Sequence, residues 1–231
     1  MHTPMNRPLL AGAVATALVA VAAVPSTAAA EVSANVGFTS NYLFRGVTQT
    51  DDQAAVQGGV DYAHDEGFYV GTWASNVDYG ADSRGYELDG YFGLASDIGD
   101  SGVGFDVGYI YYAYPSLDDS DMGEVYGGLD FMGAHAMVNL VTNADADGME
   151  DTLSYELGYG LDLTGDMTLD GTVGYVDPDE GDGEYTWWSV GLTWATELGD
   201  FTLAYTQNDI DDEDDDNADD PRVSVAFGMS F

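Results

Sequence analysis

The sequence has 231 residues and a formal net charge of −38 at pH 7, with 42 acidic residues against four Lys plus Arg. This charge repels phosphate backbones and argues against nucleic-acid binding, and the absence of cysteine excludes disulfide scaffolds. Acidic disordered chains are poor in aromatic residues, whereas this chain carries 16 Tyr, 9 Phe and 4 Trp. We therefore expect a folded chain that covers those rings.

Residues 1–30 have the form of a cleaved secretory signal. Arg7 gives a positive start, an Ala-rich apolar stretch follows, and small residues at 28–30 precede Glu31. The alternative is an uncleaved anchor, but the apolar stretch is short for one. We expect cleavage before Glu31 and one folded domain over 31–231. No later segment has the ~20 apolar residues of a spanning helix, so a membrane-spanning form would use strands.

Apolar and polar residues alternate through most of residues 31–231, which predicts strands with one apolar and one polar face. In the first strand Tyr42 and Phe44 continue the apolar face. The twelve expected strands lie at 32–45, 53–64, 67–77, 85–96, 102–114, 122–132, 134–142, 151–162, 166–176, 184–196, 200–207 and 221–231.

Connections between these strands alternate between short turns and long acidic loops. The last of the loops, from residue 207, is the most acidic. This alternation is typical of an outer-membrane barrel with periplasmic turns and extracellular loops. A β-sandwich also alternates, but strands of about ten residues suit a tilted membrane strand better. The sequence predicts an all-β, closed antiparallel up-and-down transmembrane β-barrel of twelve strands in the bacterial outer membrane.

Three stretches resemble the TorF-like family of Gram-negative outer-membrane porins. They are SNYLFRG within residues 36–80, FDVGYIYYAYP at 105–115 and EVYGGLDF at 124–131. The resemblance covers most of the chain after the signal, thins after about residue 145, and is most specific at SNYLFRG. It implies a pore-forming barrel without catalytic residues or cofactors. The chain departs from the usual look of such barrels in lacking lysine and in its very acidic sixth loop.

The polar face of each strand is expected to line the lumen. Charges belong there because an ionised side chain facing lipid costs several kcal/mol. The expected lumen acids are Asp61, Glu87, Asp89, Asp106, Glu124, Asp130, Glu156, Asp162 and Asp170. The expected lumen aromatics are Tyr91, Tyr112, Tyr114, Tyr126 and Trp187. These rings are interpreted either as a track for a ring-bearing or sugar-like solute or, preferably, as space filling in a narrow barrel.

Arg45 and Arg222 both fall on the polar, lumen-facing positions of their strands, at the loop ends of the first and last strands. These strands are neighbours in a closed barrel, so we expect the two arginines to sit together near the mouth. They form either a positive patch that shapes a constriction or grips a carboxylate, or structural ion pairs with lumen acids or with Asp219 and Asp220.

Enzyme and metal chemistry find little support in the sequence. After the signal the histidines are His64 and His135, near short turns and without a convincing Ser partner. A calcium-loop-like start at Asn143 has Ser154 where the closing Glu belongs. We expect no enzyme, no cofactor and no metal site. The preferred function is a pore for small solutes, with a preference for cations; a non-conducting structural or adhesive barrel and a lipid-modifying enzyme are the alternatives.

More than half of the acidic residues lie in the six long loops, and lysine is absent. Such a surface repels itself in dilute buffer and is relieved by salt screening. We therefore expect a marine or halophilic source. Expected partners are outer-membrane lipids, lipopolysaccharide and the barrel-assembly machinery.

The segment 222–231 alternates to its end at Phe231 and resembles the C-terminal assembly signal of outer-membrane proteins. Deleting Phe231 is expected to lower outer-membrane yield. Barrels that do assemble should keep their heat-modifiable gel shift, because a rim aromatic loses only interfacial burial. Normal yield from the deletion variant would contradict the signal interpretation.

Overall fold

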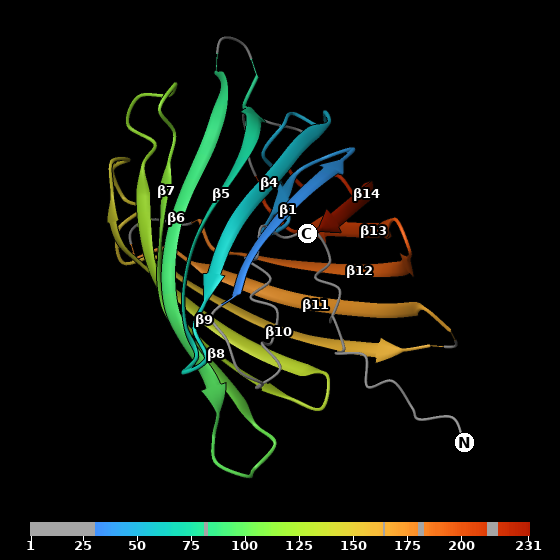
Figure 1. The fold of residues 1–231 in the computed structure, drawn as a ribbon. Helices are drawn as coiled ribbons and strands as arrows, with labels where there is room; N and C mark the ends of the chain where they lie inside the picture. The colour runs from blue at the N-terminus through green and yellow to red at the C-terminus, as the bar shows by residue number, and fades with distance from the viewer. Residues whose placement is uncertain (1–30, 81–82, 164, 180–182, 212–216) are drawn as a thin grey trace, which may run out of the picture.

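The computed structural model describes residues 31–80, 83–163, 165–179, 183–211 and 217–231, so the expected signal lies outside the described residues. Twelve strands form one closed barrel, and two short strands form a separate hairpin (Figure 1). No helix among the described residues is long and apolar enough to cross a membrane. The barrel strands are β1 (Glu31–Thr39), β4 (Ala55–Ala63), β5 (Phe68–Asp78), β6 (Arg84–Asp97), β7 (Gly104–Ala113), β8 (Met122–Phe131), β9 (Ala134–Ala144), β10 (Leu153–Asp162), β11 (Met167–Asp177), β12 (Tyr185–Thr196), β13 (Gly199–Asn208) and β14 (Arg222–Ser230); the hairpin strands are β2 (Leu43–Phe44) and β3 (Val47–Thr48).

Every barrel strand is antiparallel to its neighbours in chain order, and β1 closes the ring by pairing with both β4 and β14. Val36 lies opposite Met229 in that last pairing. The backbone N–H of Phe231 also donates to the carbonyl of Ala34 at 2.8 Å. Closure leaves the barrel with no free strand edge. The predicted closed antiparallel barrel of twelve strands is confirmed.

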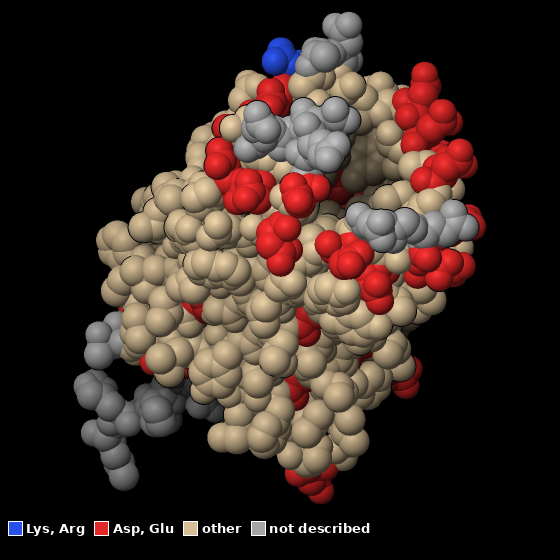
Figure 2. Space-filling model, turned by 180° about the vertical axis from the view of Figure 1, so that it is seen from behind, with Lys and Arg blue, Asp and Glu red and all other residues tan. Residues whose placement is uncertain are grey.

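Side chains on the outer face form an apolar belt. Aromatic pairs stand on this face near both ends of β12 and β13, with Trp188 beside Tyr205 at 5.1 Å and Trp194 beside Phe201 at 6.3 Å between ring centroids. Figure 2 shows Asp and Glu side chains gathered around a hollow at one end, above a broad band with few carboxylates. An apolar band flanked by aromatics is the surface that a lipid bilayer requires.

The prediction for the first strand is wrong in its second half. β1 ends at Thr39, and the chain then turns into the barrel, so Tyr42 is only 3% exposed instead of facing outward with Phe44. The Thr39 hydroxyl donates to the carbonyl of Asn41 at 2.7 Å and accepts from its N–H at 3.3 Å. A hydroxyl that bonds backbone two residues on favours a turn over a continuing strand.

Inward aromatic rings pack over glycines of neighbouring strands. A Cβ on Gly93 would lie 2.2 Å from the hydroxyl of Tyr69, and one on Gly71 would lie 2.4 Å from the ring of Tyr91. Gly174 makes room for the indole of Trp187 in the same way. Each ring therefore lies flat against the wall where a larger residue would force it away.

Replacing Gly93 with Val is expected to destabilise the barrel by about 1–3 kcal/mol, because the new side chain must displace the ring of Tyr69. The measurement is the urea midpoint of the folded band in a heat-modifiable gel assay. Gly90→Val is the matched control, since a Cβ at this outward position of the same strand meets nothing within 4 Å. Equal midpoints for the two variants would contradict the packing argument.

Candidate functional site

The segment between β1 and β4, residues 40–54, forms a hairpin inside the barrel, called the lumen hairpin below. Its strands β2 and β3 are joined by Arg45 (φ 47°) and Gly46 (φ 84°). Positive φ at both central residues is the type I′ geometry of tight hairpins. A Cβ on Gly46 would lie 2.6 Å from the Cβ of Trp187, and the Gly46 carbonyl accepts from Asn208 at 2.9 Å. The hairpin tip therefore rests against the inner wall at β12 and β13.

Arg45 at the hairpin tip is held by two glutamates of the opposite wall. Its Nη1 and Nη2 donate to Oε1 and Oε2 of Glu124 on β8 at 2.7 and 2.9 Å. Its Nε lies 3.6 Å from Oε1 of Glu156 on β10. The guanidinium carbon stands 4.6 Å from the centre of the Phe44 ring. Such forked pairing with a carboxylate is among the strongest polar contacts in proteins.

A β-bulge lies beside Glu124. The register between β8 and β9 shifts at this point, with Gly123 opposite Asn143 but Glu124 opposite Val141. Bulges bend a strand and re-aim side chains, and they occur often next to functional sites. The shift lies at the strand position that presents the carboxylate to Arg45.

A second carboxylate pair, Glu87 and Asp89 on β6, lies near the other side of the hairpin. Both are buried, with 1% and 3% exposure. The Tyr42 hydroxyl donates to Oε1 of Glu87 at 3.3 Å, and the Tyr42 ring packs edge-on against Trp73 at 5.5 Å. Glu87 Oε2 and Asp89 Oδ1 have no hydrogen-bond partner among the described residues. Two buried carboxylates without a cation are costly unless a proton or a cation joins them.

The base of the hairpin is tied to the last barrel strand. Asp52 Oδ1 accepts from Asn41 at 2.6 Å and from Nε of Arg222 at 2.7 Å. Arg222 also donates to the carbonyls of Ala218 and Asp220 in the sixth long loop. Arg222 thus joins the first long loop to the sixth.

The expected arginine pair has separate partners. Arg45 is not at the end of a barrel strand, as the sequence suggested, but at the hairpin tip, where it binds Glu124. Arg222 binds Asp52, and its contact with Asp220 is to the carbonyl instead of the expected carboxylate.

The short-turn end of the lumen is more open and carries the remaining predicted acids. Asp130 and Asp162 are exposed there, whereas Asp170 is 9% exposed. Asp61 accepts from the hydroxyl of Tyr91 at 2.5 Å. Asp106 likewise accepts from Tyr69 at 2.7 Å. The lumen is therefore narrowed by the hairpin toward the long loops and lined by partly exposed carboxylates at the other end.

Of the predicted aromatics, Tyr91, Tyr112, Tyr114 and Trp187 are buried inside the barrel and Tyr126 is partly buried. The Tyr112 hydroxyl donates to Glu124 at 3.2 Å, and the Tyr126 hydroxyl bonds that of Tyr69. Among the described residues, the sequence prediction missed the inward rings of Tyr42, Phe44, Tyr69 and Trp73. Alternation along 68–77 offered the signal for two of them, since every second residue of β5 from Tyr69 onward turns inward.

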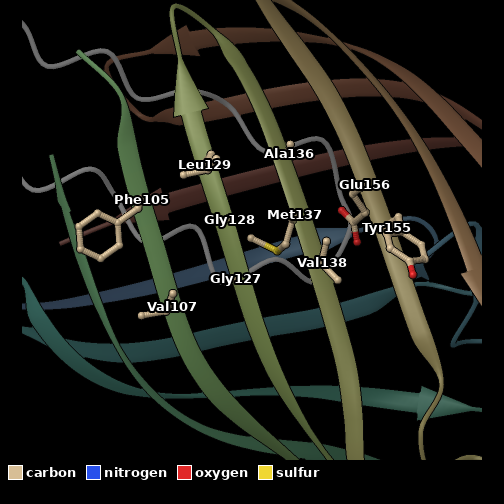
Figure 3. A pocket seen from close by; sticks show the side chains of 10 residues that line it. All are labelled: Phe105, Val107, Gly127, Gly128, Leu129, Ala136, Met137, Val138, Tyr155 and Glu156. Atoms are coloured by element: carbon tan, nitrogen blue, oxygen red, sulfur yellow. The ribbon is translucent and has the colours of Figure 1, made fainter. Parts of the chain in front are cut away.

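One pocket opens on the outer face instead of the lumen. Figure 3 shows its lining on β7 to β10, where Gly127 and Gly128 leave a depression between Val107 and Val138. Both valines are exposed and belong to the apolar belt. The depression is a gap in that belt, and its lining also includes Glu156 of β10.

No group of three or more His, Cys, Asp or Glu is placed to hold a metal within the described parts of the chain. Asn143, the first residue of the calcium-loop-like stretch, accepts a hydrogen bond from the hydroxyl of Tyr109 at 3.0 Å. His64 forms a contact of 2.8 Å with its neighbour Asp65 at a short turn. His135 lies against Gly158 on the inner wall.

Comparison with known proteins assigns this chain to a family. A family model described as "Bacterial protein of unknown function (Gcw_chp)" matches residues 22–227. The chain belongs to the Gcw_chp family. A search of curated proteins finds no match to this Gcw_chp chain. The resemblance to the TorF-like porins stays a prediction.

Solved structures share the fold of this Gcw_chp chain. The KdgM porin superposes with a TM-score of 0.55 at 7% identity, over 86% of this chain and 98% of KdgM. The KdgM porin in complex with disordered oligogalacturonate gives 0.53 at 7% identity, over 88% and 98%. The outer membrane protein OpdK from Pseudomonas aeruginosa is more distant, with a TM-score of 0.42 at 15% identity over 78% and 58%. At such identities the likeness to KdgM shows a shared porin fold.

Replacing Gly46 with Ala is expected to loosen the lumen hairpin, because the methyl group meets Trp187 and a positive φ costs a non-glycine residue about 1–2 kcal/mol. Hydrogen exchange of residues 42–50 should speed up in the detergent-solubilised barrel. Gly148→Ala is the control, since Gly148 has a similar φ of 78° but a Cβ there meets nothing within 4 Å. Unchanged exchange in the Gly46 variant would show that the tip is not held at this position.

Proposed function

We propose that this chain is an outer-membrane pore that passes small solutes and prefers cations. The observation that carries the proposal is the charge inside the barrel. The nine acids predicted to face inward stand against Arg45 and Arg222, and the Arg45 guanidinium is already shared by Glu124 and Glu156. A wall of one charge concentrates counter-ions and excludes co-ions. Protonation of crowded carboxylates reduces the charge but keeps its sign.

The porin fold of KdgM supports a transport role, and one KdgM structure contains oligogalacturonate. Oligogalacturonate is a polymer of sugar acids, and the acidic inner face of this chain would repel it. We therefore propose neutral or cationic small solutes for this barrel. The inward aromatic rings would contribute apolar surface along the path.

A second candidate function, a non-conducting structural barrel, is favoured by the lumen hairpin. Tyr42, Leu43 and Thr50 of this segment are each no more than 3% exposed, so the hairpin fills part of the lumen. In a pore, the same hairpin narrows the path and selects what passes. Conductance of the wild-type barrel separates the two functions.

The proposal places the apolar belt among outer-membrane lipids and the acidic loops beside lipopolysaccharide. Residues 1–30 would direct secretion, and Phe231, which is 74% exposed, would be available to the barrel-assembly machinery. No enzymatic activity is proposed. KdgM is a porin, and the two histidines of residues 31–231 lie apart at the short-turn end.

In planar bilayers with a KCl gradient, the wild-type barrel should give a reversal potential of the cation-selective sign, and raising the salt on both sides should weaken it. Asp106→Asn combined with Asp130→Asn should reduce the selectivity, because both lie inside toward the short-turn end. Asp100→Asn, in the exposed turn between β6 and β7, is the matched control and should behave as wild type. Anion selectivity would overturn the proposal, and absent conductance would favour the structural barrel.

A further inference from the structure

The glutamates that hold Arg45 have the arrangement of a guanidinium-binding site. Glu124 offers both oxygens in one plane at 2.7 and 2.9 Å, and Glu156 approaches from a different strand at 3.6 Å. The Phe44 ring and the Tyr112 hydroxyl complete the surroundings. A planar guanidinium matches this set, whereas an ammonium group is a point charge that uses only part of it.

Arg45 fills the site incompletely. The Nε of Arg45 and the Oε2 of Glu156 are both buried, and neither has a hydrogen-bond partner among the described residues. Glu156 is 6% exposed, so its free oxygen is shut away from bulk solvent. An unpaired buried polar atom costs about 1–3 kcal/mol. A guanidinium free of the hairpin could settle between the two carboxylates and donate to Oε2 of Glu156 as well as to Glu124.

The lumen hairpin is short, and its tip is held to the barrel wall by side-chain contacts. β2 and β3 are two residues long each and pair only with each other. The ties to the rest of the barrel near the tip include the Arg45 contacts, the bond from Asn208 to the Gly46 carbonyl and the edge-on packing of Phe44 against Tyr112. A separate anchor, from Arg222 to Asp52, lies at the base of the hairpin. If the contacts of Arg45 are replaced, the tip can leave the wall while the bond from Arg222 to Asp52 keeps the base in place.

We propose that Glu124 and Glu156 form a binding site for guanidinium-bearing solutes, and that Arg45 occupies this site in the closed lumen. A solute with a free guanidinium competes with Arg45, takes its place between the carboxylates and releases the hairpin tip. The proposal deepens the proposed pore function, because it names the solute class and the residue that the solute displaces. No covalent step is involved.

The carboxylates of β6 extend the same site toward the other side of the hairpin. Glu87 and Asp89 each keep one unpartnered oxygen in a buried setting beside Tyr42. Asp89 lies opposite Tyr112 across the strand pair, and Tyr112 donates to Glu124. A cation that leaves Glu124 can thus move to a second carboxylate pair, Glu87 and Asp89, on the other side of the Tyr112 ring. The aromatic rings between them add cation–π attraction.

The test is chemical rescue of Arg45→Ala in the purified full barrel. Removing Arg45 leaves Glu124 and Glu156 without their cation, so the transition temperature of the heat-modifiable gel shift should fall. Millimolar methylguanidinium should restore it, and methylammonium at equal ionic strength should not. In Arg45→Ala combined with Glu124→Gln, the apparent affinity for methylguanidinium should drop by about tenfold or more, as expected for a lost charged hydrogen-bond pair.

Arg222→Ala serves as the matched control. It also removes an inward arginine, but its partner Asp52 is 56% exposed, so methylguanidinium should not rescue it. Equal rescue by methylammonium, or rescue of both arginine variants alike, would overturn the guanidinium site. No rescue of Arg45→Ala would overturn it as well.

A second measurement uses the wild-type barrel and therefore does not depend on the folding of a variant. In the wild-type barrel, methylguanidinium should speed hydrogen exchange of residues 42–48 while exchange of the barrel strands stays constant. Unchanged exchange of the hairpin would contradict displacement of Arg45. None of these measurements uses conductance, so a barrel that binds methylguanidinium but carries no current would refute the pore and keep the site.

Discussion

Closure of the backbone ladder is the constraint on which the rest of this structure depends. Once β1 pairs with both β4 and β14, each barrel strand has two neighbours and two faces. One face is the apolar belt, so the charged residues of the strands have only the interior left. The interior consequently receives far more carboxylates than a narrow space can hold without positive charge. The placement of Arg45 follows from this excess.

Arg45 brings that positive charge from a loop instead of from the wall. A cation on a wall strand would contact side chains of the adjacent strands. A cation at the hairpin tip instead reaches Glu124 and Glu156 on strands across the lumen. The tight turn at Gly46 lets the tip fit beside Trp187. The same segment thereby neutralises part of the interior and narrows it, so charge balance and lumen width are set by one element.

Much of the barrel could be predicted, because residues that alternate with a period of two over many long segments form strands and not helices. Parity alone also placed Glu87, Glu124 and Trp187 on the inner face, where they are buried. It failed at Tyr42, since alternation happens to continue past the point where Thr39 starts a turn. Glu124, the partner of Arg45, lies 79 positions away along the chain, and no local sequence pattern predicts a pairing over that separation. Pairing across a lumen depends on the closed shape, which exists only after all strands are joined.

The bond between Arg222 and Asp52 bears on the order in which the molecule is built. Asp52 belongs to the first long loop, whereas Arg222 opens the last strand, 170 positions later. The base of the lumen hairpin therefore gains this anchor only when β14 is in place beside β1. Without the pairing of β14 with β1, the sheet has an open seam and the hairpin lacks its basal tie. Closing the barrel wall and anchoring the inner hairpin are thus coupled through the same strand.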